Sequence, residues 1–264
     1  MLSFGAATAK CPLMVSLGEV VAFLDVELRT TEIPDYPGAL NGLQLQNSGA
    51  VPRIVAAVDA SLPVIRKAAA DGPGLLIVHH GMFWQGAQPV TGPLYEKIKV
   101  AMDAGLAIYS SHLPLDFHPE WGNNIGLARA INLAGISPFM ESKGRAMGLR
   151  GTWSGSRHSL KELLEQAVGG PVHLCPGGGE SVSRIGIVTG GAGTEVANAA
   201  AEGVDAFVTG EGPHWSFPMA EELGINVFYA GHYATETFGV KMISEMLSAR
   251  FGIPWSFIDH PTGL

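Results

Sequence analysis

The sequence predicts an α/β protein with two pseudo-symmetric lobes that arise from an internal duplication. Each lobe is expected to be a mainly parallel or mixed sheet flanked by helices. Two observations support this prediction. Short apolar runs alternate with helical segments along the chain, as they do in strand–helix–strand units. The segment 53–81 also aligns without a gap with 184–212, and such a repeat means that one supersecondary unit occurs twice.

The first half begins with a helix. Ser16 and Glu19 form a capping-box pattern in front of an apolar run, and this helix should end before Ile33-Pro34. The stretch Asn41-Gly42-Leu43-Gln44 predicts a turn. Further along, we expect strands over 53–58, 75–78 and 106–110, a helix over 62–71, another ending at 101–105, and an alanine-rich one ending near 133.

The second half repeats this order after a connecting region that contains a strand near 149–154 and a capped helix from Ser159. The repeat aligns the strand 75–78 with the strand 206–209, and it aligns residues 109–116 with residues 229–236. We expect the first lobe to contain residues 1–130 and about 230–264. The second lobe should contain about 131–229, with the functional site between the two lobes.

Composition restricts the function classes. Of the 264 residues, 47% are hydrophobic and only 15% are charged, so we expect apolar surface to be buried in an oligomer. The net charge of −8 without a Lys/Arg cluster argues against nucleic-acid binding. No apolar run is long enough for a membrane span. Cys11 and Cys175 are too far apart for a disulfide framework and indicate free thiols in a reducing cytoplasm.

Histidines and carboxylates cluster after three predicted strands. His79 and His80 are adjacent, and the spacings His112-x-x-x-Asp116 and His232-x-x-x-Glu236 are the same. Imidazole and carboxylate ligands without cysteine suit Zn, Fe or Mn, and two such ions need a bridging carboxylate or water. The candidate ligands are His79, His80, Asp116, His232 and Glu236. The alternative is that His79 and His80 are buried histidines with satisfied hydrogen bonds.

Several other residues have open roles. His112 could ligate, move a proton or make a structural hydrogen bond. Glu211 and His214 could hold the pocket, meet the substrate or cap the structure. We expect the tryptophans near the clusters to pack in the core, with stacking on a ring substrate as the alternative: Trp84, Trp121 and Trp215. Gly190–Gly193 could bind an anion through backbone N–H groups. The remaining histidines are expected at the surface: His118, His158, His173 and His260.

An ordered set of motifs resembles the Nif-three-like family, also labelled GTP cyclohydrolase 1 type 2. These are NGLQ at 41–44, VHHG at 78–81, SSHLPLD at 110–116, TGE at 209–211 and GHYATE at 231–236. The resemblance runs from about Ser16 to the C-terminus and lacks the domain that longer relatives insert between the halves. It implies a ring-shaped homohexamer with two divalent metal ions bound by the five candidate ligands, Glu236 bridging. Asn123-Asn124 departs from a more usual Asn-Asp pair.

The resemblance also implies an activity. A metal-bound hydroxide would open the imidazole ring of GTP and release formate, with His112 or Glu211 as candidate proton-transfer groups. No guanine-reading or triphosphate-binding set is evident in the sequence. We therefore expect a cytoplasmic, metal-dependent hydrolase that acts on a small nucleotide-like molecule. The alternative is a non-catalytic protein that binds or delivers metal, or that interacts with other proteins.

Overall fold

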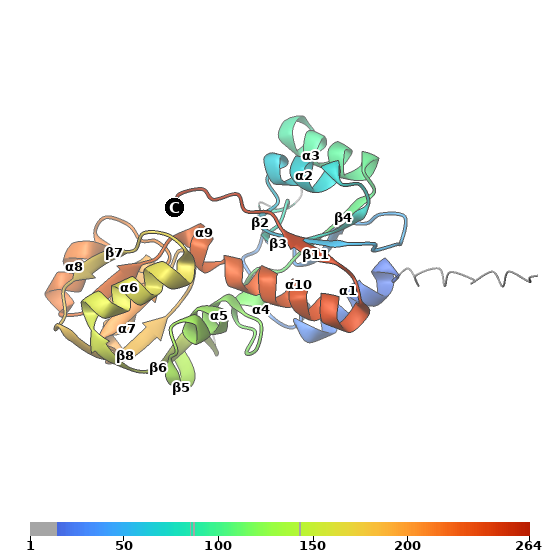
Figure 1. The fold of residues 1–264 in the computed structure, drawn as a ribbon. Coiled ribbons are helices and arrows are strands. Elements are labelled where there is room, and N and C mark those ends of the chain that lie inside the picture. The colour runs from blue at the N-terminus through green and yellow to red at the C-terminus, as the bar shows by residue number, and fades with distance from the viewer. Residues whose placement is uncertain (1–14, 85, 87, 143) are drawn as a thin grey trace, which may run out of the picture.

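The computed structural model describes residues 15–84, 86, 88–142 and 144–264, so Cys11 lies outside the described residues. Figure 1 shows two sheets, each covered by helices, with the long helix α10 (Thr237–Phe251) between them. The mixed α/β architecture with two lobes confirms the predicted fold class. The division of the chain at residues 130 and 230 stays a prediction.

The first sheet has the strand order β1-β4-β3-β2-β11, in which β1 is antiparallel to β4 and the other strands are parallel. Helices α1 and α10 pack on one face and helices α2 and α3 on the other. The bounds are β1 Gly42–Leu45, β2 Ile54–Asp59, β3 Gly74–His80, β4 Leu106–Ser110, β11 Trp255–Phe257, α1 Leu17–Glu27, α2 Leu62–Ala70 and α3 Gly92–Asp103.

The second sheet has the order β5-β6-β8-β9-β10-β7. Helices α5 and α6 cover one face, and α7 and α8 cover the other. The bounds are β5 Ala134–Ser142, β6 Arg145–Ser156, β7 His173–Pro176, β8 Ser181–Ile187, β9 Ala206–Thr209, β10 Asn226–Tyr229, α5 Asn123–Ala130, α6 Arg157–Val168, α7 Val196–Ala201 and α8 Ser216–Leu223. Three short helices follow strand ends: α4 (Leu113–Asp116), η1 (Gly193–Glu195) and α9 (His232–Thr235).

The two sheets share the topology that the sequence repeat predicts. Strands β2, β3 and β4 form a parallel set, as do β8, β9 and β10. The last strand of each set carries an antiparallel edge strand, β1 on β4 and β7 on β10. Since parallel strands end at the same edge of a sheet, each lobe presents its strand ends together.

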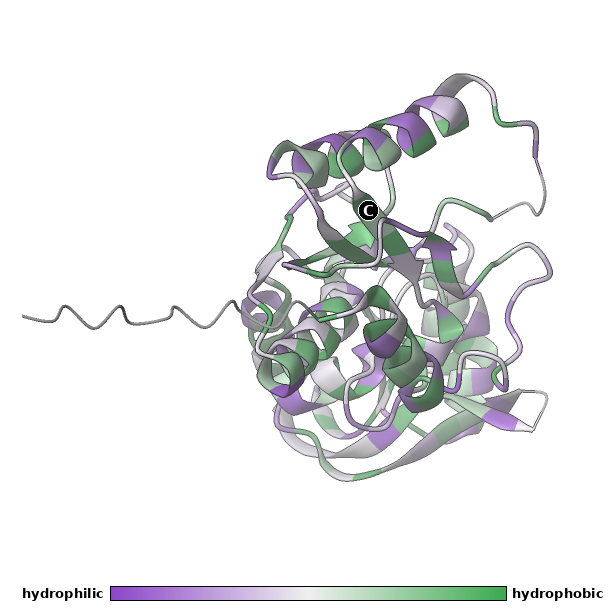
Figure 2. Cartoon of the chain, turned by 90° about the vertical axis from the view of Figure 1, so that its right-hand side faces the viewer, coloured by the Kyte–Doolittle hydropathy of each residue, from purple (hydrophilic) through white to green (hydrophobic). Residues whose placement is uncertain are grey.

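Each sheet is buried on both faces, which explains the continuous apolar runs in the sequence. In β2, Ile54 and Ala56 face α1 and α10, while Val55 and Ala57 face α2 and α3. Burying each large aliphatic side chain contributes about 1.5–3 kcal/mol to folding. Figure 2 shows the helices of the chain mixing hydrophobic and hydrophilic residues, as expected for elements with one face on a core.

Of three local predictions, one is wrong, one needs refinement and one is confirmed. The turn predicted over residues 41–44 is wrong, because strand β1 begins at Gly42 and extends to Leu45. Helix α6 is capped by Ser156, and Ser159 is the third helical residue that completes a capping box. At the start of α1 the predicted box of Ser16 and Glu19 is confirmed.

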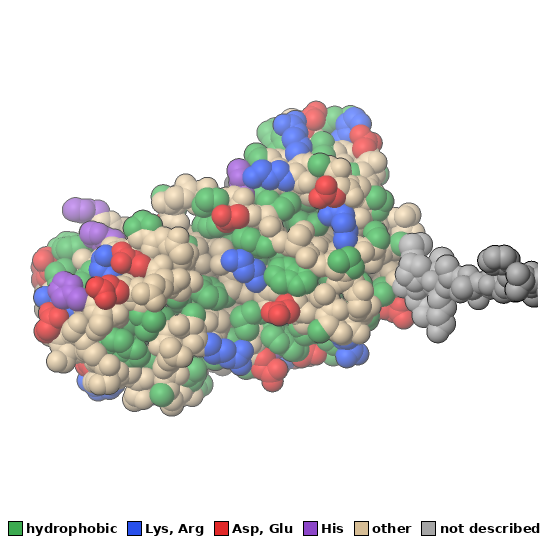
Figure 3. Space-filling view, in the orientation of Figure 1, with side chains coloured by type: hydrophobic (Ala, Val, Ile, Leu, Met, Phe, Trp, Pro, Cys, Tyr) green, Lys and Arg blue, Asp and Glu red, His purple; other side chains and the backbone are tan. Residues whose placement is uncertain are grey.

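Among the described residues, the charged side chains on the surface do not form a basic patch on the face shown in Figure 3. On the face drawn in Figure 3, Lys and Arg side chains are scattered among acidic ones instead of gathering in a patch. Within the described ranges, every helix falls short of the length and hydrophobicity that a membrane crossing requires.

Candidate metal centre

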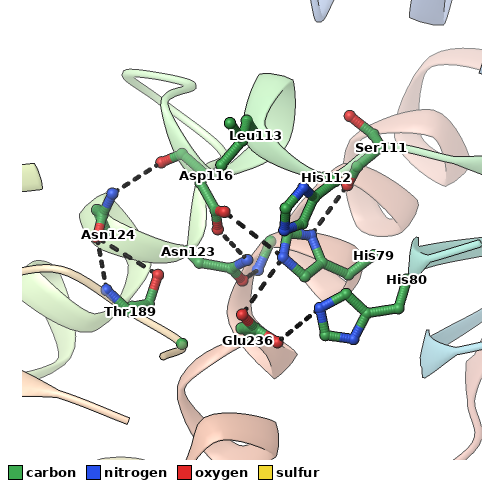
Figure 4. A network of polar contacts seen from close by, with 12 residues as sticks. His79, His80, Ser111, His112, Leu113, Asp116, Asn123, Asn124, Thr189 and Glu236 are labelled. Atoms are coloured by element: carbon green, nitrogen blue, oxygen red, sulfur yellow. Dashed lines mark hydrogen bonds and ion pairs between the residues drawn. The ribbon is translucent and has the colours of Figure 1, made fainter. Parts of the chain in front are cut away.

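The candidate ligands come from strand ends of both sheets. His79 and His80 end β3. His112 is the N-cap of the short helix α4 that follows β4, and Asp116 is the last residue of that helix. His232 begins α9, which follows β10 of the second sheet, and Glu236 is the C-cap of this helix. Figure 4 shows how several of these side chains point toward one another. All five residues that the sequence singled out as metal ligands therefore meet at the junction of the lobes.

Glu236 lies at the middle of the cluster. Its Oε1 is 3.5 Å from His79 Nε2 and 3.1 Å from His232 Nε2, while its Oε2 is 3.3 Å from His80 Nε2. Two ligand atoms that share one metal ion, each about 2.1 Å from it, are separated by roughly 3.0–3.5 Å. The two oxygens of one carboxylate thus face different imidazoles at separations typical of shared coordination.

Each of the four central imidazoles is held through its Nδ1 atom. The acceptors are Ser111 O for His79 (2.9 Å), Asp59 Oδ1 for His80 (2.8 Å), Asp35 Oδ1 for His112 (2.9 Å) and Glu211 Oε1 for His232 (2.8 Å). An acceptor at Nδ1 keeps the proton there and leaves the Nε2 lone pair free, which is the usual arrangement of metal-binding histidines.

Asp116 is oriented in the same way by its neighbours. Asn123 Nδ2 donates to Asp116 Oδ1 at 2.8 Å, and Asn123 Oδ1 accepts from the backbone N–H of Gly239 at 2.7 Å. The other oxygen, Asp116 Oδ2, lies 3.5 Å from His79 Nε2. One carboxylate oxygen is therefore fixed by an amide, and the second faces the cluster.

Two buried atoms of the cluster have no hydrogen-bond partner among the described residues. They are His79 Nε2 and Glu236 Oε2. A buried polar atom without a partner costs about 1–3 kcal/mol, so an unfilled lone pair at this depth needs an explanation. A bound cation would use both atoms, and the residues therefore fit a metal. The sets that could hold an ion are His79, His80 and His112, and His80, His232 and Glu236.

The electrostatics of the cluster favour a positive charge. Burial opposes the charged form of His79, but Asp116 and Glu236 outweigh it and raise its pKa to about 9. Burial likewise opposes protonation of His232, and Glu236 and Glu211 raise its pKa to about 9. The same imidazoles hold the pKa of Glu236 well below its usual range, although burial alone would raise it. Protons and a metal ion would thus compete for the same imidazole nitrogens in this negative potential.

A cavity of about 620 Å³ opens onto the cluster. Trp84 lies against His80 and His112 with ring centroids 5.1 and 4.7 Å apart, so this tryptophan lines the site and does not pack in the core as expected. Trp121 packs against the core as expected. The expectation of core packing is wrong for Trp215, which is 46% exposed. His118, expected at the surface, is only 9% exposed in its side chain because it stacks on Trp121.

Glu211 and His214 have different surroundings. Glu211 bonds to His232 and borders both the main cavity and a second one of about 580 Å³ behind it. His214 borders the second cavity and is not among the described residues that line the main one. The histidines His158 and His173 are exposed, as expected, and Cys175 is a buried free thiol.

The loop Gly190–Gly193 supports the cluster and is not a free anion cradle. Three of its N–H groups are used within the fold: Gly190 donates to Thr235 Oγ1, Ala192 to Thr209 Oγ1 and Gly193 to Glu211 O. Gly190 has φ +71°, and a Cβ there would lie 2.3 Å from Glu236 Oε1. Glycine is therefore required where the backbone of one lobe meets this carboxylate.

Sequence reasoning missed the groups behind the imidazoles. Asp35 lies in the loop after α1 and also accepts from Asn41 Nδ2, and Asn41 Oδ1 accepts from His112 N–H. Burial opposes ionisation of Asp35, but the His112 hydrogen bond outweighs it and lowers its pKa to about 2. Asp59 ends β2 beside His80 in the register of the sheet. A signal for Asp59 was available in the sequence. Its carboxylate comes at the end of the strand that precedes the strand with His79 and His80.

The fold and the site together define the class of protein. It is a two-lobed α/β protein with a candidate metal centre of imidazoles and carboxylates at the junction of the lobes. Residues 16–262 match the family model described as Duf34/NIF3 (NGG1p interacting factor 3). The chain belongs to this family, which confirms the resemblance seen in the sequence.

Similar proteins cover almost the whole chain. A protein of Deinococcus radiodurans named GTP cyclohydrolase 1 type 2 homolog is 42% identical over 249 residues, which cover 93% of this chain and 94% of that protein. A protein of the same name from Pyrococcus horikoshii is 40% identical, with coverages of 93% and 98%. The crystal structure of TTHA1606 from Thermus thermophilus superimposes with a TM-score of 0.87 at 39% identity, with coverages of 94% and 100%.

Proposed function

We propose that this protein binds two divalent metal ions and acts as a metal-dependent hydrolase on a small nucleotide-like molecule. The ligands would be His79, His80, Asp116, His232 and Glu236, with Glu236 as the bridge. The observation that carries the proposal is the arrangement around Glu236. Its two oxygens face three imidazole Nε2 atoms, and every one of those imidazoles is held at Nδ1 by a separate acceptor. Such an arrangement is better suited to binding a cation than to forming a hydrogen-bond network among the side chains themselves.

When bound, divalent ions of this kind lower the pKa of a coordinated water to about 7 and stabilise developing negative charge. The residues of the chain supply the rest. Asp35 holds the Nδ1 proton of His112, so that His112 Nε2 is free to accept or return a proton at the cluster. Glu211 fixes His232 through Oε1, and its position on the cavity wall lets it take a proton from a bound molecule. We propose these two residues as the proton-transfer groups.

The relatives named GTP cyclohydrolase 1 type 2 homolog make guanine nucleotides the first substrates to test. Protein purified without an affinity metal would be loaded with Zn, Mn or Fe(II) and incubated with GTP and GMP. Formate would be quantified, and the nucleotide products would be separated by chromatography. We expect metal-dependent release of formate that is lost in His112→Asn. Metal-loaded protein that leaves guanine nucleotides intact would contradict the hydrolase and favour a role in metal binding or delivery.

The proposal includes a homohexamer in the cytoplasm. The large hydrophobic side chains left exposed on the single chain support association, among them Val26 at 77% and Met102 at 62% exposure. Size-exclusion chromatography with light scattering tests it directly. A mass near six times 27.7 kDa is expected, and a monomer at micromolar concentration would contradict it.

A further inference from the structure

Apart from the imidazoles of the cluster, the charged side chains that line the main cavity are mostly acidic. Among the described residues that line it, Arg145 is the one Lys or Arg, whereas the acidic side chains are five: Asp35, Asp116, Glu195, Glu211 and Glu236. Sites that bind several phosphates present several cations or a run of free backbone N–H groups. The acidic lining and the occupied amides of Gly190, Ala192 and Gly193 offer neither.

Arg145 is nevertheless available to an anion. It begins β6 in the second sheet, and its Nη2 reaches across the lobe junction to donate to the backbone O of Glu32 at 2.7 Å. Within residues 15–84, 86, 88–142 and 144–264, no carboxylate lies within 4.0 Å of its guanidinium. A guanidinium can make several further hydrogen bonds in its plane, so most of its donor capacity remains for a ligand.

Aromatic rings line the same cavity beside the histidines. The centroid of the Tyr36 ring is 5.8 Å from that of His112, and Tyr36 is 64% exposed. The Trp84 ring contacts the rings of both His112 and His80. An exposed tyrosine at a cavity wall has a free ring face. Stacking of a base on such a face contributes about 1–3 kcal/mol, and it tolerates any flat ring.

We infer that this cavity binds a planar heteroaromatic molecule that carries a single anionic group, either one phosphate or one carboxylate. Tyr36 and Trp84 hold the ring next to the candidate metal centre, and Arg145 pairs with the anionic group. The inference rests on the proposed function and narrows its substrate class, because it disfavours a triphosphate. Additional phosphates would meet the carboxylates of the lining, and among the described lining residues no second Lys or Arg is present to pair with them.

Binding to metal-loaded protein tests the inference, with affinities measured by isothermal titration calorimetry. The probes are guanosine, GMP, GTP and pterin-6-carboxylate. In the wild type we expect GMP to bind about tenfold or more tightly than guanosine, and GTP to bind no better than GMP. A charge-assisted hydrogen bond of about 1.5–3 kcal/mol corresponds to a factor of roughly ten or more.

Two variants separate the two contacts. Arg145→Gln keeps a donor for Glu32 O but removes the charge, and we expect it to weaken GMP at least about tenfold while guanosine is unchanged. Tyr36→Leu should weaken GMP and guanosine alike, by about fivefold or more. Arg150→Gln is the matched control for Arg145→Gln, since Arg150 lies on the same strand and pairs with Glu202 on the surface. We expect it to bind like the wild type.

Every other outcome overturns the inference. Tighter binding of GTP than of GMP, unchanged GMP affinity in Arg145→Gln, or no binding of GMP and pterin-6-carboxylate would each contradict it. The metal content of every sample is measured in parallel. Wild-type protein that takes up no metal would instead refute the proposed centre, so the two failures can be told apart.

Discussion

Replacing Asn124 by alanine should weaken the junction between the lobes. Asn124 is 3% exposed and makes four hydrogen bonds that join segments from both sheets. Its Nδ2 donates to Asp116 O at 3.1 Å and Met147 O at 3.2 Å, and its Oδ1 accepts from Thr189 N at 3.0 Å and Oγ1 at 3.3 Å. At about 0.5–1.5 kcal/mol each, and less than additive, these bonds predict a loss of about 2–4 kcal/mol in the free energy of unfolding.

Urea unfolding of chelator-treated protein, followed by circular dichroism, measures this loss. Asn198→Ala is the matched control, because Asn198 is exposed on α7 and its side-chain amide donates to Glu195 Oε2 on the surface. A difference of less than about 0.5 kcal/mol between the two variants would refute the reasoning. It would show that the buried amide does not hold the lobes together.

Three further predictions concern separate parts of the molecule. Ser16→Ala removes the capping box of α1 and should cost about 1 kcal/mol, measured by urea unfolding; an unchanged midpoint would contradict it. His112→Asn should retain the metal content of the wild type but lose turnover; loss of metal would make His112 a ligand. Burial opposes ionisation of Asp205, but hydrogen bonds from Ser183 and Arg184 outweigh it and lower its pKa. Asp205→Asn should therefore cost about 1 kcal/mol at neutral pH. The difference from the wild type should shrink as the pH falls below about 4, because the carboxylate is then protonated first in the unfolded chain and, at still lower pH, in the folded protein; a pH-independent difference would contradict this.

The architecture was predictable from two features of the sequence. The internal repeat predicts two sets of parallel strands, and the continuous apolar runs predict that these strands are buried on both faces of their sheets. The strand predicted at 106–110 coincides with β4, and that at 206–209 coincides with β9. Strand β1 was not predictable in the same way. Its residues form a strand by pairing with β4, and this long-range pairing leaves no local signal.

The candidate ligands were also predictable, since histidines and carboxylates at strand ends form a pattern in the sequence. The residues behind them were not. Asp35 reaches His112 from a loop far away in the chain, and Gln44 packs beneath Gly81, where its Oε1 accepts from Met82 N–H. Such contacts depend on how the lobes and loops meet in three dimensions. Trp84 was misassigned for the same reason, because an aromatic residue beside a histidine pair is compatible with core and cavity alike.

The measurement that tests the central claim most directly is elemental analysis of the purified protein beside its Glu236→Ala and His79→Ala variants. We predict about two equivalents of Zn, Fe or Mn in the wild type. Glu236→Ala should lose both ions more completely than His79→Ala, because a bridging carboxylate contacts both. Equal retention in the two variants would contradict the bridge. A wild type that contains no metal and takes up none on titration would contradict the metal centre itself.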